Sequence, residues 1–534
     1  MMTILHSLSV LYVAIFSLIA LATADDAAPK RVAVIGAGAA GASTAYFLRK
    51  HADDSEIPVN VTVFERASHV GGRSTTVNVF DDPVYPVELG ASIFVQVNEH
   101  LVNASRDLGL SARSAGHARP RESVDTIGIW DGEQFVFILQ DTYSWWNIGK
   151  LLWRYGWAPV RTQRLMKATV GKFLRLYDEP LFPFRSLSAA AEAVGLLDTT
   201  AAPGSVYLDQ NSVSPEFARE IIQASTRVNY GQNLPLIHGL EAMVCMATDG
   251  AMAIEGGNWR IFDGMLKAAK ANVRANHAVT SIDRNHDHSL TVTFEANNAE
   301  QKQTFDEVVI AGPLQYSDLA INPPLDIVPD EIPYVELYVT LFSSPHRLLP
   351  KYFGRTGPDD QVPETVLTTL PEGTDLGSSR QGVGPAGFWS ISTLQTAKPR
   401  RSSAHDDQDH YVYKIFSPEQ PTAEFLRSIL GLNADGAAST ANQTIADLPK
   451  SDVSWFHEKI WNPYPFLYPR VTFEDTELSS NIWYTGGIES FISTMETSAL
   501  MGHNVATLIS QSWEDPIDVD VGDDPVVGHD DTEL

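Results

Sequence analysis

Three glycines near the start of the chain have the spacing of a dinucleotide-binding motif. The motif is G-x-G-x-x-G and consists of Gly36, Gly38 and Gly41. It follows an apolar run typical of a buried strand and precedes a helix-forming stretch. In such a motif the first glycine permits a tight turn, the second lets a pyrophosphate approach the backbone, and the third allows close packing of helix and strand. The pyrophosphate then lies at the positive N-terminal end of the helix.

A second apolar run ends at an acidic residue, Glu65, 24 positions after Gly41. Its carboxylate can accept hydrogen bonds from ribose hydroxyls, and an acid at this position favours an unphosphorylated ribose. FAD or NAD is therefore expected rather than NADP. Because strand, glycines, helix, second strand and acid occur in this order, the pattern is far more specific than the glycines alone.

The segment after Glu65 favours FAD. It contains a second glycine pair flanked by arginines, and after a short hairpin an E-x-G-x-x sequence follows at 88–92. This layout resembles the GG-motif flavoproteins of the amine-oxidase and glutathione-reductase type. The resemblance implies cofactor contacts from two groups of residues: Arg66, Gly72 and Arg73 along the pyrophosphate, and Gly90, Ala91 and Ser92 beside the flavin.

In such flavoproteins the FAD domain is discontinuous, so further pieces are expected downstream. By resemblance Val279 lies near the adenine, and the apolar run 304–311 is the strand that returns the chain to the nucleotide. The last piece contains Gly487 and Glu489 and is followed by a helix. The N-terminus of that helix can stabilise negative charge on the reduced flavin, with Glu489 near the ribityl chain.

The chain has 534 residues, enough for two or three domains or for one enzyme fold with an inserted lobe. The expected fold class is α/β, with a discontinuous Rossmann-type FAD-binding domain and an inserted α+β substrate-binding lobe. The expected FAD-binding domain comprises residues 31–100, 250–315 and 480–513. The expected substrate domain comprises residues 101–249 and 316–479.

Within the substrate domain, runs of apolar and β-branched residues at 335–342 and 411–416 predict strands. The stretches 356–375 and 381–409 are rich in glycine, proline, serine and charge, and they predict loops. The aromatic segment contains Trp145, Trp146, Trp153 and Trp157. Its spacing follows one helical face, so most of these side chains are expected in the core. The alternatives are an isoprenoid channel or a surface that meets a membrane.

The charge and the cysteine content exclude several classes of protein. The formal net charge is −28, which argues against nucleic acid as a partner. Cys245 is the single cysteine, so neither an intrachain disulfide nor a cysteine-based zinc cluster can form, and no metal site is expected. Its thiol is expected to be buried as a small hydrophobic group. Residues 514–534 carry nine acids and no base, which predicts a disordered solvating tail.

Residues 1–24 form an apolar run that ends in Ala22-Thr23-Ala24, a pattern that predicts a signal peptide cleaved before Asp25. Three N-x-S/T sequons occur, at Asn60, Asn103 and Asn442. Asn442 is the best candidate for glycosylation because its surroundings are polar, whereas Asn60 opens a core strand and is expected to be inaccessible. The expected localisation is the secretory pathway, ending in a lysosome or vacuole or outside the cell.

Four further segments resemble the prenylcysteine oxidase, or prenylcysteine lyase, family of secretory flavoproteins, and the resemblance extends from about residue 31 to 513. The segments are 142–161, RVNYGQ at 227–232, 247–258 and 487–504. The resemblance implies FAD-dependent oxidation of S-farnesyl- or S-geranylgeranyl-cysteine at the prenyl carbon beside sulfur. Water then adds, and the products are cysteine, a prenyl aldehyde and, with O2 as acceptor, hydrogen peroxide.

Two residues of the RVNYGQ segment are the candidates for the substrate end of the site. Arg227 and Tyr230 are the candidates for holding the cysteine carboxylate and lining the flavin pocket, and structural ion pairing is the alternative role for the arginine. No general base is assigned, and His503 is expected to pack or to cap a helix. The competing functions are an amine or polyamine oxidase, for which no lysine–water relay is recognisable in the sequence, and a non-catalytic flavoprotein or lipid-binding homologue.

Overall fold

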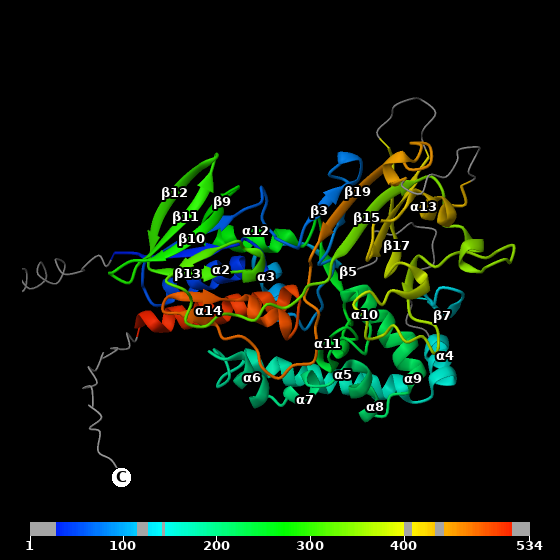
Figure 1. The fold of residues 1–534 in the computed structure, drawn as a ribbon, viewed down its shortest axis with the longest axis horizontal. Helices are drawn as coiled ribbons and strands as arrows, with labels where there is room; N and C mark the ends of the chain where they lie inside the picture. Colours follow the sequence, from blue (N-terminus) through cyan, green and yellow to red (C-terminus); the bar gives the residue numbers. More distant parts are fainter. Residues whose placement is uncertain (1–27, 115–125, 141–144, 400–407, 433–442, 515–534) are drawn as a thin grey trace, which may run out of the picture.

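The computed structural model describes residues 28–114, 126–140, 145–399, 408–432 and 443–514. It has a nucleotide-binding part built around two sheets and a second part in which a large sheet lies above a layer of helices (Figure 1). The fold is therefore mixed α/β, as the sequence predicted. Among the described residues, no helix is both long and apolar enough to cross a membrane.

A six-stranded sheet forms the centre of the nucleotide-binding part. Its strands, in spatial order, are β20 (Glu477–Ser479), β21 (Ile482–Tyr484), β13 (Glu307–Ile310), β1 (Lys30–Ile35), β2 (Val59–Glu65) and β9 (Asn272–Ala275). All neighbours are parallel except β20 and β21. The inner strands are apolar because parallel strands are covered on both faces. Neighbouring strands thus come from four distant parts of the chain, which is the predicted discontinuity.

Two helices from opposite ends of the sequence pack closely beside this sheet (Figure 1). They are α2 (Ala39–Asp54) and α14 (Met495–Glu514). A Cβ atom at Gly502 would lie 2.3 Å from the Ala40 carbonyl oxygen, so the two backbones are in direct contact there. Helices α3 (Glu99–Asp107) and α12 (Trp259–Ala268) contribute to the same apolar core.

A smaller sheet covers the other side of the nucleotide-binding part. It consists of β12 (Ala299–Phe305), β11 (Leu290–Ala296), β10 (Ala278–Arg284) and β14 (Ala320–Asn322). Two ribbons connect the parts: β3 (Thr76–Asn78) with β4 (Pro86–Glu88), and β5 (Ala112–Ser114) with β8 (Met252–Ile254).

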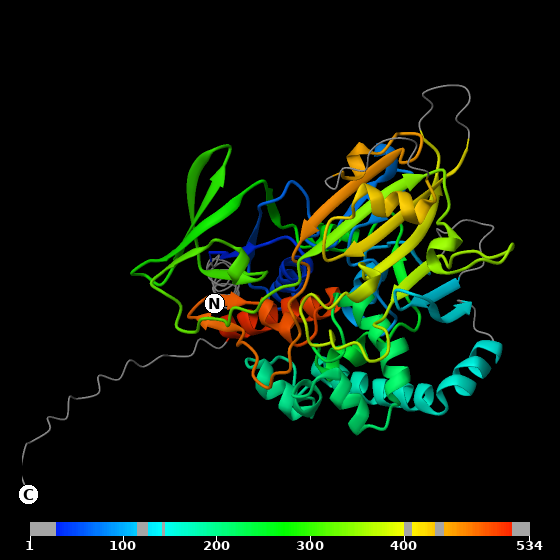
Figure 2. The ribbon, with the colours of Figure 1, turned by 45° about the vertical axis from the view of Figure 1, so that its right-hand side comes forward.

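The second part contains a seven-stranded sheet and the helical layer (Figures 1 and 2). The sheet consists of β19 (Trp455–Trp461), β15 (Leu337–Ser344), β18 (His410–Ser417), β17 (Ser390–Ala397), β16 (Thr365–Thr368), β6 (Thr126–Trp130) and β7 (Phe135–Gln140). The helices are α4 (Trp145–Tyr155), α5 (Ala158–Leu174), α6 (Leu187–Ala193), α7 (Leu197–Thr200), α8 (Gly204–Gln210), α9 (Pro215–Phe217), α10 (Gln223–Tyr230) and α11 (Gly239–Val244). Helix α13 (Ala423–Leu430) packs against the sheet.

Two sequence expectations about this part are corrected. The stretches expected to be loops contain β16 and β17, which lie inside the seven-stranded sheet. β16 has only four residues, and both strands have glycine- and proline-rich flanks, so the average composition of each stretch hid them. The strands expected at 335–342 and 411–416 are present as β15 and β18.

The boundary between the parts also differs from the expected one. Strand β14 pairs with β10, and β20 pairs with β21, so both belong to the nucleotide-binding part. Helix α3 packs in the core of that part as well, although residues from 101 onward were assigned to the substrate domain. Each of these segments has few residues, and its place is decided by its pairing partner rather than by its own sequence.

The described residues include two of the three sequons. Asn60 is exposed, contrary to expectation. It is the second residue of β2 and lies before the continuous run of buried residues in that strand. Asn103 is exposed on α3. The predicted signal peptide, Asn442 and residues 515–534 of the predicted tail lie outside the described residues.

Candidate active site

A cavity of about 1630 Å³ extends between the nucleotide-binding part and the second part. Its wall includes the glycine turn before α2, the end of β2, strands β4 and β18, and the N-terminus of α14. Most of the predicted cofactor residues face it: Gly36, Gly38, Glu65, Arg66, Gly72, Arg73, Gly90, Ala91, Ser92, Val279 and Glu489. The structure thus gathers, in one place, residues separated by more than 400 positions.

The start of α2 is suited to bind an anion. Gly38 is its N-cap, no side chain caps the first turn, and no acid lies in that turn. The first backbone N–H groups of a helix lack internal partners and carry partial positive charge. A Cβ built on Gly38 would lie 3.9 Å from the Gly72 Cα atom, and one built on Gly72 would lie 3.3 Å from the Gly38 Cα atom, so the two glycine motifs lie against each other at this end of the helix. A pyrophosphate fits this position.

Gly41 has a different role, and it does not line the cavity. A Cβ atom on it would lie 2.0 Å from the Gly36 carbonyl oxygen and 3.1 Å from the Val34 side chain. It therefore allows α2 to pack directly on β1, as the motif predicts for the third glycine.

Glu65 is held in place by two backbone N–H groups. Its two carboxylate oxygens accept hydrogen bonds from Ala37 N at 2.9 Å and from Ala67 N at 2.8 Å. A carboxylate has further lone pairs, which remain able to accept from ribose hydroxyls. Arg66 donates to the Tyr316 carbonyl at 3.0 Å, and Val279 lies at the same end of the cavity. This end fits the adenosine half of a dinucleotide.

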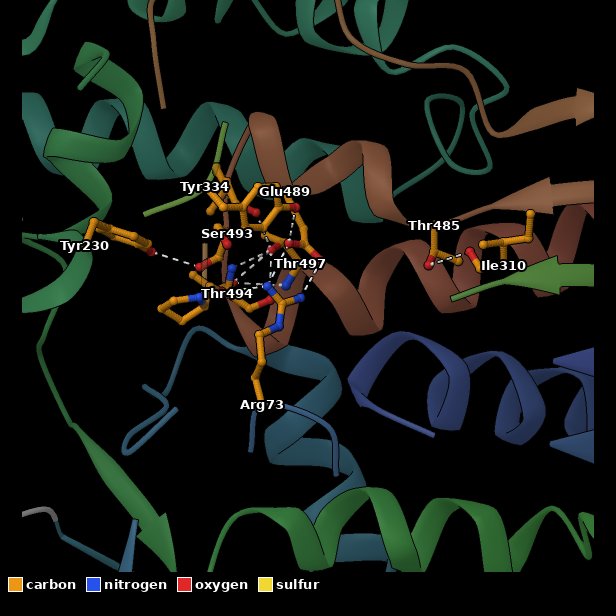
Figure 3. Close-up of polar contacts among 11 residues, drawn as sticks. Arg73, Tyr230, Ile310, Tyr334, Thr485, Glu489, Ser493, Thr494 and Thr497 are labelled. Carbon is orange, nitrogen blue, oxygen red and sulfur yellow. Dashed lines mark hydrogen bonds and ion pairs between the residues drawn. The ribbon is translucent and has the colours of Figure 1, made fainter. Parts of the chain in front are cut away.

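The structure joins two predicted cofactor residues that the sequence placed separately. Arg73 and Glu489 form an ion pair through two hydrogen bonds, one of them 2.7 Å long from Nη1 to Oε2 (Figure 3). Tyr334 also donates to Glu489, at 2.9 Å, and Arg73 donates to the Pro463 carbonyl at 2.6 Å. Burial and the carboxylate raise the pKa of Tyr334. The pair joins the second glycine motif to the segment before α14.

The segment before α14 forms part of the cavity wall. Thr494 caps this helix, since its hydroxyl accepts from Thr497 N at 3.1 Å, and both residues line the cavity (Figure 3). Gly487 does not line it: a Cβ atom there would lie 2.9 Å from the Glu474 Cβ atom. Gly487 therefore acts in packing, and Glu489 is the member of this predicted pair that faces the cavity.

The sequence analysis missed a half-buried lysine in the cavity wall. Lys414, in β18, donates to Ser92 Oγ at 3.1 Å and to the Glu88 carbonyl at 3.2 Å. Burial lowers the pKa of Lys414 to about 8, although Glu88 opposes the shift. Burial also raises the pKa of the Glu88 carboxyl to about 7. The available signal was a lysine in the middle of the otherwise apolar run 411–416.

Of the two candidates from the RVNYGQ segment, one lines the cavity and the other does not. Tyr230 lines the cavity and donates to the Ser493 carbonyl at 3.0 Å (Figure 3). Arg227 is fully buried and does not line it. Its donors are used by Thr368, Asn233, Gly382 and Val383, at 2.6 to 3.1 Å. The expectation that Arg227 holds a substrate carboxylate is therefore corrected, because this guanidinium holds the second part together.

An apolar section of the cavity lies against the helical layer. We call it the apolar chamber, and it is lined by Val170, Phe173, Leu174, Val228, Val244 and Ile492. These residues come from α5, α10, α11 and the segment after Glu489. Cys245 is buried at its edge, as expected for a small hydrophobic group. Arg113, in β5, also lines the cavity and has no carboxylate partner in the described part of the chain.

Comparison with known proteins identifies the family. The sequence model described as prenylcysteine lyase matches residues 138–520, and a model described as an NAD(P)-binding Rossmann-like domain matches residues 34–108. Similar proteins include farnesylcysteine lyase of Arabidopsis thaliana, 30% identical, with 91% of this chain and 89% of the relative covered. The chain belongs to the prenylcysteine lyase family. Prenylcysteine oxidase 1 of Homo sapiens is 29% identical, with 92% and 91% covered.

Solved structures with a similar fold are more distant than these family members. Cyclohexylamine oxidase from Brevibacterium oxydans matches with a TM-score of 0.54 at 16% identity, covering 91% of this chain and all of that one. Putrescine oxidase with bound putrescine matches with a TM-score of 0.52 at 14% identity, with 90% and 99% covered. At this identity the match shows a shared fold, so this prenylcysteine lyase family member has the architecture of these oxidases.

The family assignment agrees with the cofactor fit. The uncapped start of α2, the close approach of Gly38 and Gly72, and the anchored Glu65 suit the two halves of a dinucleotide. The cavity continues past Ser92 and Lys414 to the N-terminus of α14, which leaves room for an isoalloxazine ring. FAD is the cofactor that this set of residues fits. Among the described residues, no group of three or more histidine, cysteine or acidic side chains could hold a metal ion.

His503 was expected to pack or to cap a helix rather than to take part in catalysis. His503 packs in α14, stacked on Phe47 with ring centres 3.7 Å apart and bonded to His100 at 3.0 Å. This agrees with a packing role.

Trp153 and Trp157 are exposed, so the expectation of core positions is wrong for them. The left-handed Gly156 interrupts the helix between them, and the continuous helical face assumed from the sequence does not exist. The side chains of Trp145 and Trp146 lie outside the described ones.

Proposed function

We propose that this family member is an FAD-dependent oxidase that cleaves the thioether of a prenylated cysteine, such as S-farnesyl- or S-geranylgeranyl-cysteine. One observation carries the proposal: the apolar chamber and the dinucleotide groove are sections of a single cavity. An isoprenoid chain is apolar and gains free energy when it leaves water, at roughly 25 cal/mol per Å² of buried area. The names of the relatives support the same substrate class.

The overall reaction balances as thioether plus water plus O2, giving cysteine, a prenyl aldehyde and hydrogen peroxide. Bound FAD supplies the acceptor for the hydride that leaves the prenyl carbon beside sulfur. Water adds to the sulfur-stabilised cation, the C–S bond breaks, and sulfur leaves with the electron pair and takes up a proton. Electrons reach O2, which leaves as hydrogen peroxide.

The protein's own task is to position the substrate and to control water and charge. The apolar chamber holds the prenyl chain and excludes water, while the ion pair between Arg73 and the buried Glu489 fixes another part of the cavity wall. Lys414 can hold or release a proton near neutral pH at Nζ, where Ser92 Oγ orients it. Positioning of this kind accounts for a large part of enzymatic rate acceleration.

Arg113 replaces Arg227 as the candidate for the substrate carboxylate. The Arg113→Gln variant is expected to raise KM for S-farnesylcysteine by roughly tenfold or more, since a charged hydrogen bond contributes about 1.5 to 3 kcal/mol. KM for S-farnesylcysteine methyl ester, which lacks the charge, should change little. Steady-state peroxide release measures both values. Arg106→Gln, an exposed change on α3 away from the cavity, is the control. Equal effects on both substrates would rule out this role.

Amine or polyamine oxidation is the second candidate function. It is favoured by Lys414, which provides the lysine in the cavity wall that such chemistry requires and that the sequence analysis did not identify. Against it, the relatives that cover about nine tenths of this chain are named for prenylated cysteine.

Anaerobic mixing separates the candidate functions. Purified yellow holoprotein is mixed without oxygen, first with S-farnesylcysteine and in a separate experiment with a polyamine, and flavin absorbance is followed. Bleaching by the thioether alone, with peroxide formed when oxygen is admitted, is the expected result. Bleaching by the amine alone would contradict the proposal, and no bleaching by either would indicate a non-catalytic flavoprotein.

We also propose a secretory route that ends in a lysosome or vacuole or outside the cell, with peripheral contact with a membrane. The apolar run at 1–24 and the exposed sequons at Asn60 and Asn103 support the route. Prenylated cysteines are lipids that partition into membranes, which supports the peripheral contact.

A further inference from the structure

The turn between α4 and α5 exposes large apolar side chains. Trp153 is 89% exposed, Trp157 is 68% exposed and Leu152 is 37% exposed. Single exposed apolar side chains are ordinary on protein surfaces, but two exposed tryptophans within five residues are not. Figure 2 shows α4 at the outer edge of the helical layer, where a large flat partner could reach it.

The same stretch carries positive charge in a strongly acidic chain. Residues 142–177 contain no acidic residue, whereas the whole chain has a net charge of −28. The stretch has seven basic residues, all of them exposed: Lys150, Arg154, Arg161, Arg164, Lys167, Lys172 and Arg175. In a chain that is otherwise so acidic, this concentration of positive charge favours binding to an anionic partner at this surface.

Helical spacing brings the aromatic and basic side chains together. In α4, Lys150 lies one turn before Trp153. In α5, Arg161 and Arg164 follow its N-cap residue, Trp157, at intervals of one turn. Residues three or four positions apart occupy one helical face. Tryptophan beside lysine and arginine is the composition found where a helix lies in the headgroup region of a bilayer.

We propose that this surface docks on an anionic lipid membrane. We call it the α4–α5 surface and define it by Leu152, Trp153 and Trp157 with the basic residues Lys150, Arg161, Arg164 and Lys167. The tryptophan rings enter the headgroup region, and the basic side chains neutralise acidic lipid headgroups. A second copy of this chain is a poorer occupant of this surface. Its net charge is −28, but it lacks the dense layer of phosphates that an anionic membrane presents.

The α4–α5 surface is connected to the cavity by a single helix. Trp157 is the N-cap of α5, and Val170, Phe173 and Leu174 near its other end line the apolar chamber. Thirteen residues of helix span roughly 20 Å. Resting on the proposed function, this arrangement places the docking surface for a lipid substrate and the chamber that holds its prenyl chain at the two ends of one helix.

Vesicle cosedimentation of the full-chain holoprotein tests the docking surface. We expect binding to phosphatidylcholine vesicles that contain phosphatidylserine, weak binding to phosphatidylcholine alone, and loss of binding at high salt. The Trp153→Ser/Trp157→Ser variant should bind at least about tenfold more weakly. The Lys150→Gln/Lys167→Gln variant should lose roughly tenfold or more, since each cation near such a surface contributes about 1 kcal/mol.

Matched controls separate this surface from general effects. Lys302→Gln/Lys351→Gln removes the same charge from exposed positions elsewhere, and Val328→Ser removes an exposed apolar side chain elsewhere. Both should bind vesicles like the parent protein. Unchanged binding by the α4–α5 variants would overturn the proposal, as would a change in their oligomeric state without vesicle binding by the parent. Vesicle binding needs no turnover, so this result is independent of the flavin-bleaching experiment.

Discussion

The Gly38→Val variant is expected to fold normally but to be purified without FAD. Gly38 has an ordinary backbone conformation, with φ −81° and ψ −165°, that valine can adopt. Within the protein, the nearest atoms to a new Cβ are 3.9 and 4.0 Å away, so the Cβ atom itself meets no clash. The side chain would instead occupy the space in front of α2 where the pyrophosphate binds. Flavin absorbance per protein should fall below about a tenth of the parent value, with the melting temperature of the apoprotein unchanged.

The Gly41→Ala variant is the matched control within the same motif. Its Cβ atom would lie 2.0 Å from the Gly36 carbonyl oxygen, so the helix and strand must separate. Overpacking of this kind costs about 3 kcal/mol, or more where the backbone cannot shift. The melting temperature of the apoprotein should fall by about 5 °C or more. If Gly38→Val lowered the melting temperature as much and Gly41→Ala kept it, the assignment of the two glycines would be wrong.

The Lys414→Met variant is expected to slow the reaction of the reduced enzyme with O2 by roughly 100-fold. Lys414 is a half-buried cation held at the cavity by Ser92 Oγ at 3.1 Å. A preorganised positive charge stabilises the negative charge that appears on oxygen as it accepts an electron, and removing one such group costs about 3 kcal/mol. Stopped-flow mixing of the reduced enzyme with oxygenated buffer measures this rate.

The pH dependence of this rate gives a sharper test. The pKa of Lys414 is lowered to about 8, so the cation is present below pH 8 and is lost as the pH rises through that value. The parent rate should therefore decline above about pH 8, while the Lys414→Met rate should be flat there. Lys459→Met, an exposed lysine on the neighbouring part of the cavity rim, is the control. A declining rate in both Lys414→Met and the parent would assign the titration to another group.

The dinucleotide-binding half of the site could be predicted from the sequence because its determinants are local. A glycine pattern between a strand and a helix specifies a backbone shape within ten residues, and Glu65 follows at the end of the next strand. The same reasoning cannot see pairings between distant segments. The ion pair between Arg73 and Glu489 joins residues 416 positions apart, and nothing in either local sequence specifies it.

The substrate half of the site was harder to predict for the same reason. Arg227 and Tyr230 occupy one turn of α10, yet one faces the interior and the other faces the cavity. Which of the two faces the cavity depends on β16 and on the segment around 382–383, which bind Arg227. Lys414 required the position of β18 in the seven-stranded sheet. Long-range packing, rather than local propensity, decides such positions.

The neighbours of β1 in the six-stranded sheet are β2, which is close in sequence, and β13, whose Glu307 pairs with Val32 across 275 positions. The edge beyond β13 is completed by β21, and α14 covers α2. During synthesis on the ribosome, the first glycine motif therefore emerges long before the strands that flank it. The nascent chain must hold unpaired strand edges until almost the last residues have been translated. A chain that stops before about residue 480 would lack β21, Glu489 and α14, and with them one wall of the cofactor site, however intact its N-terminal motif.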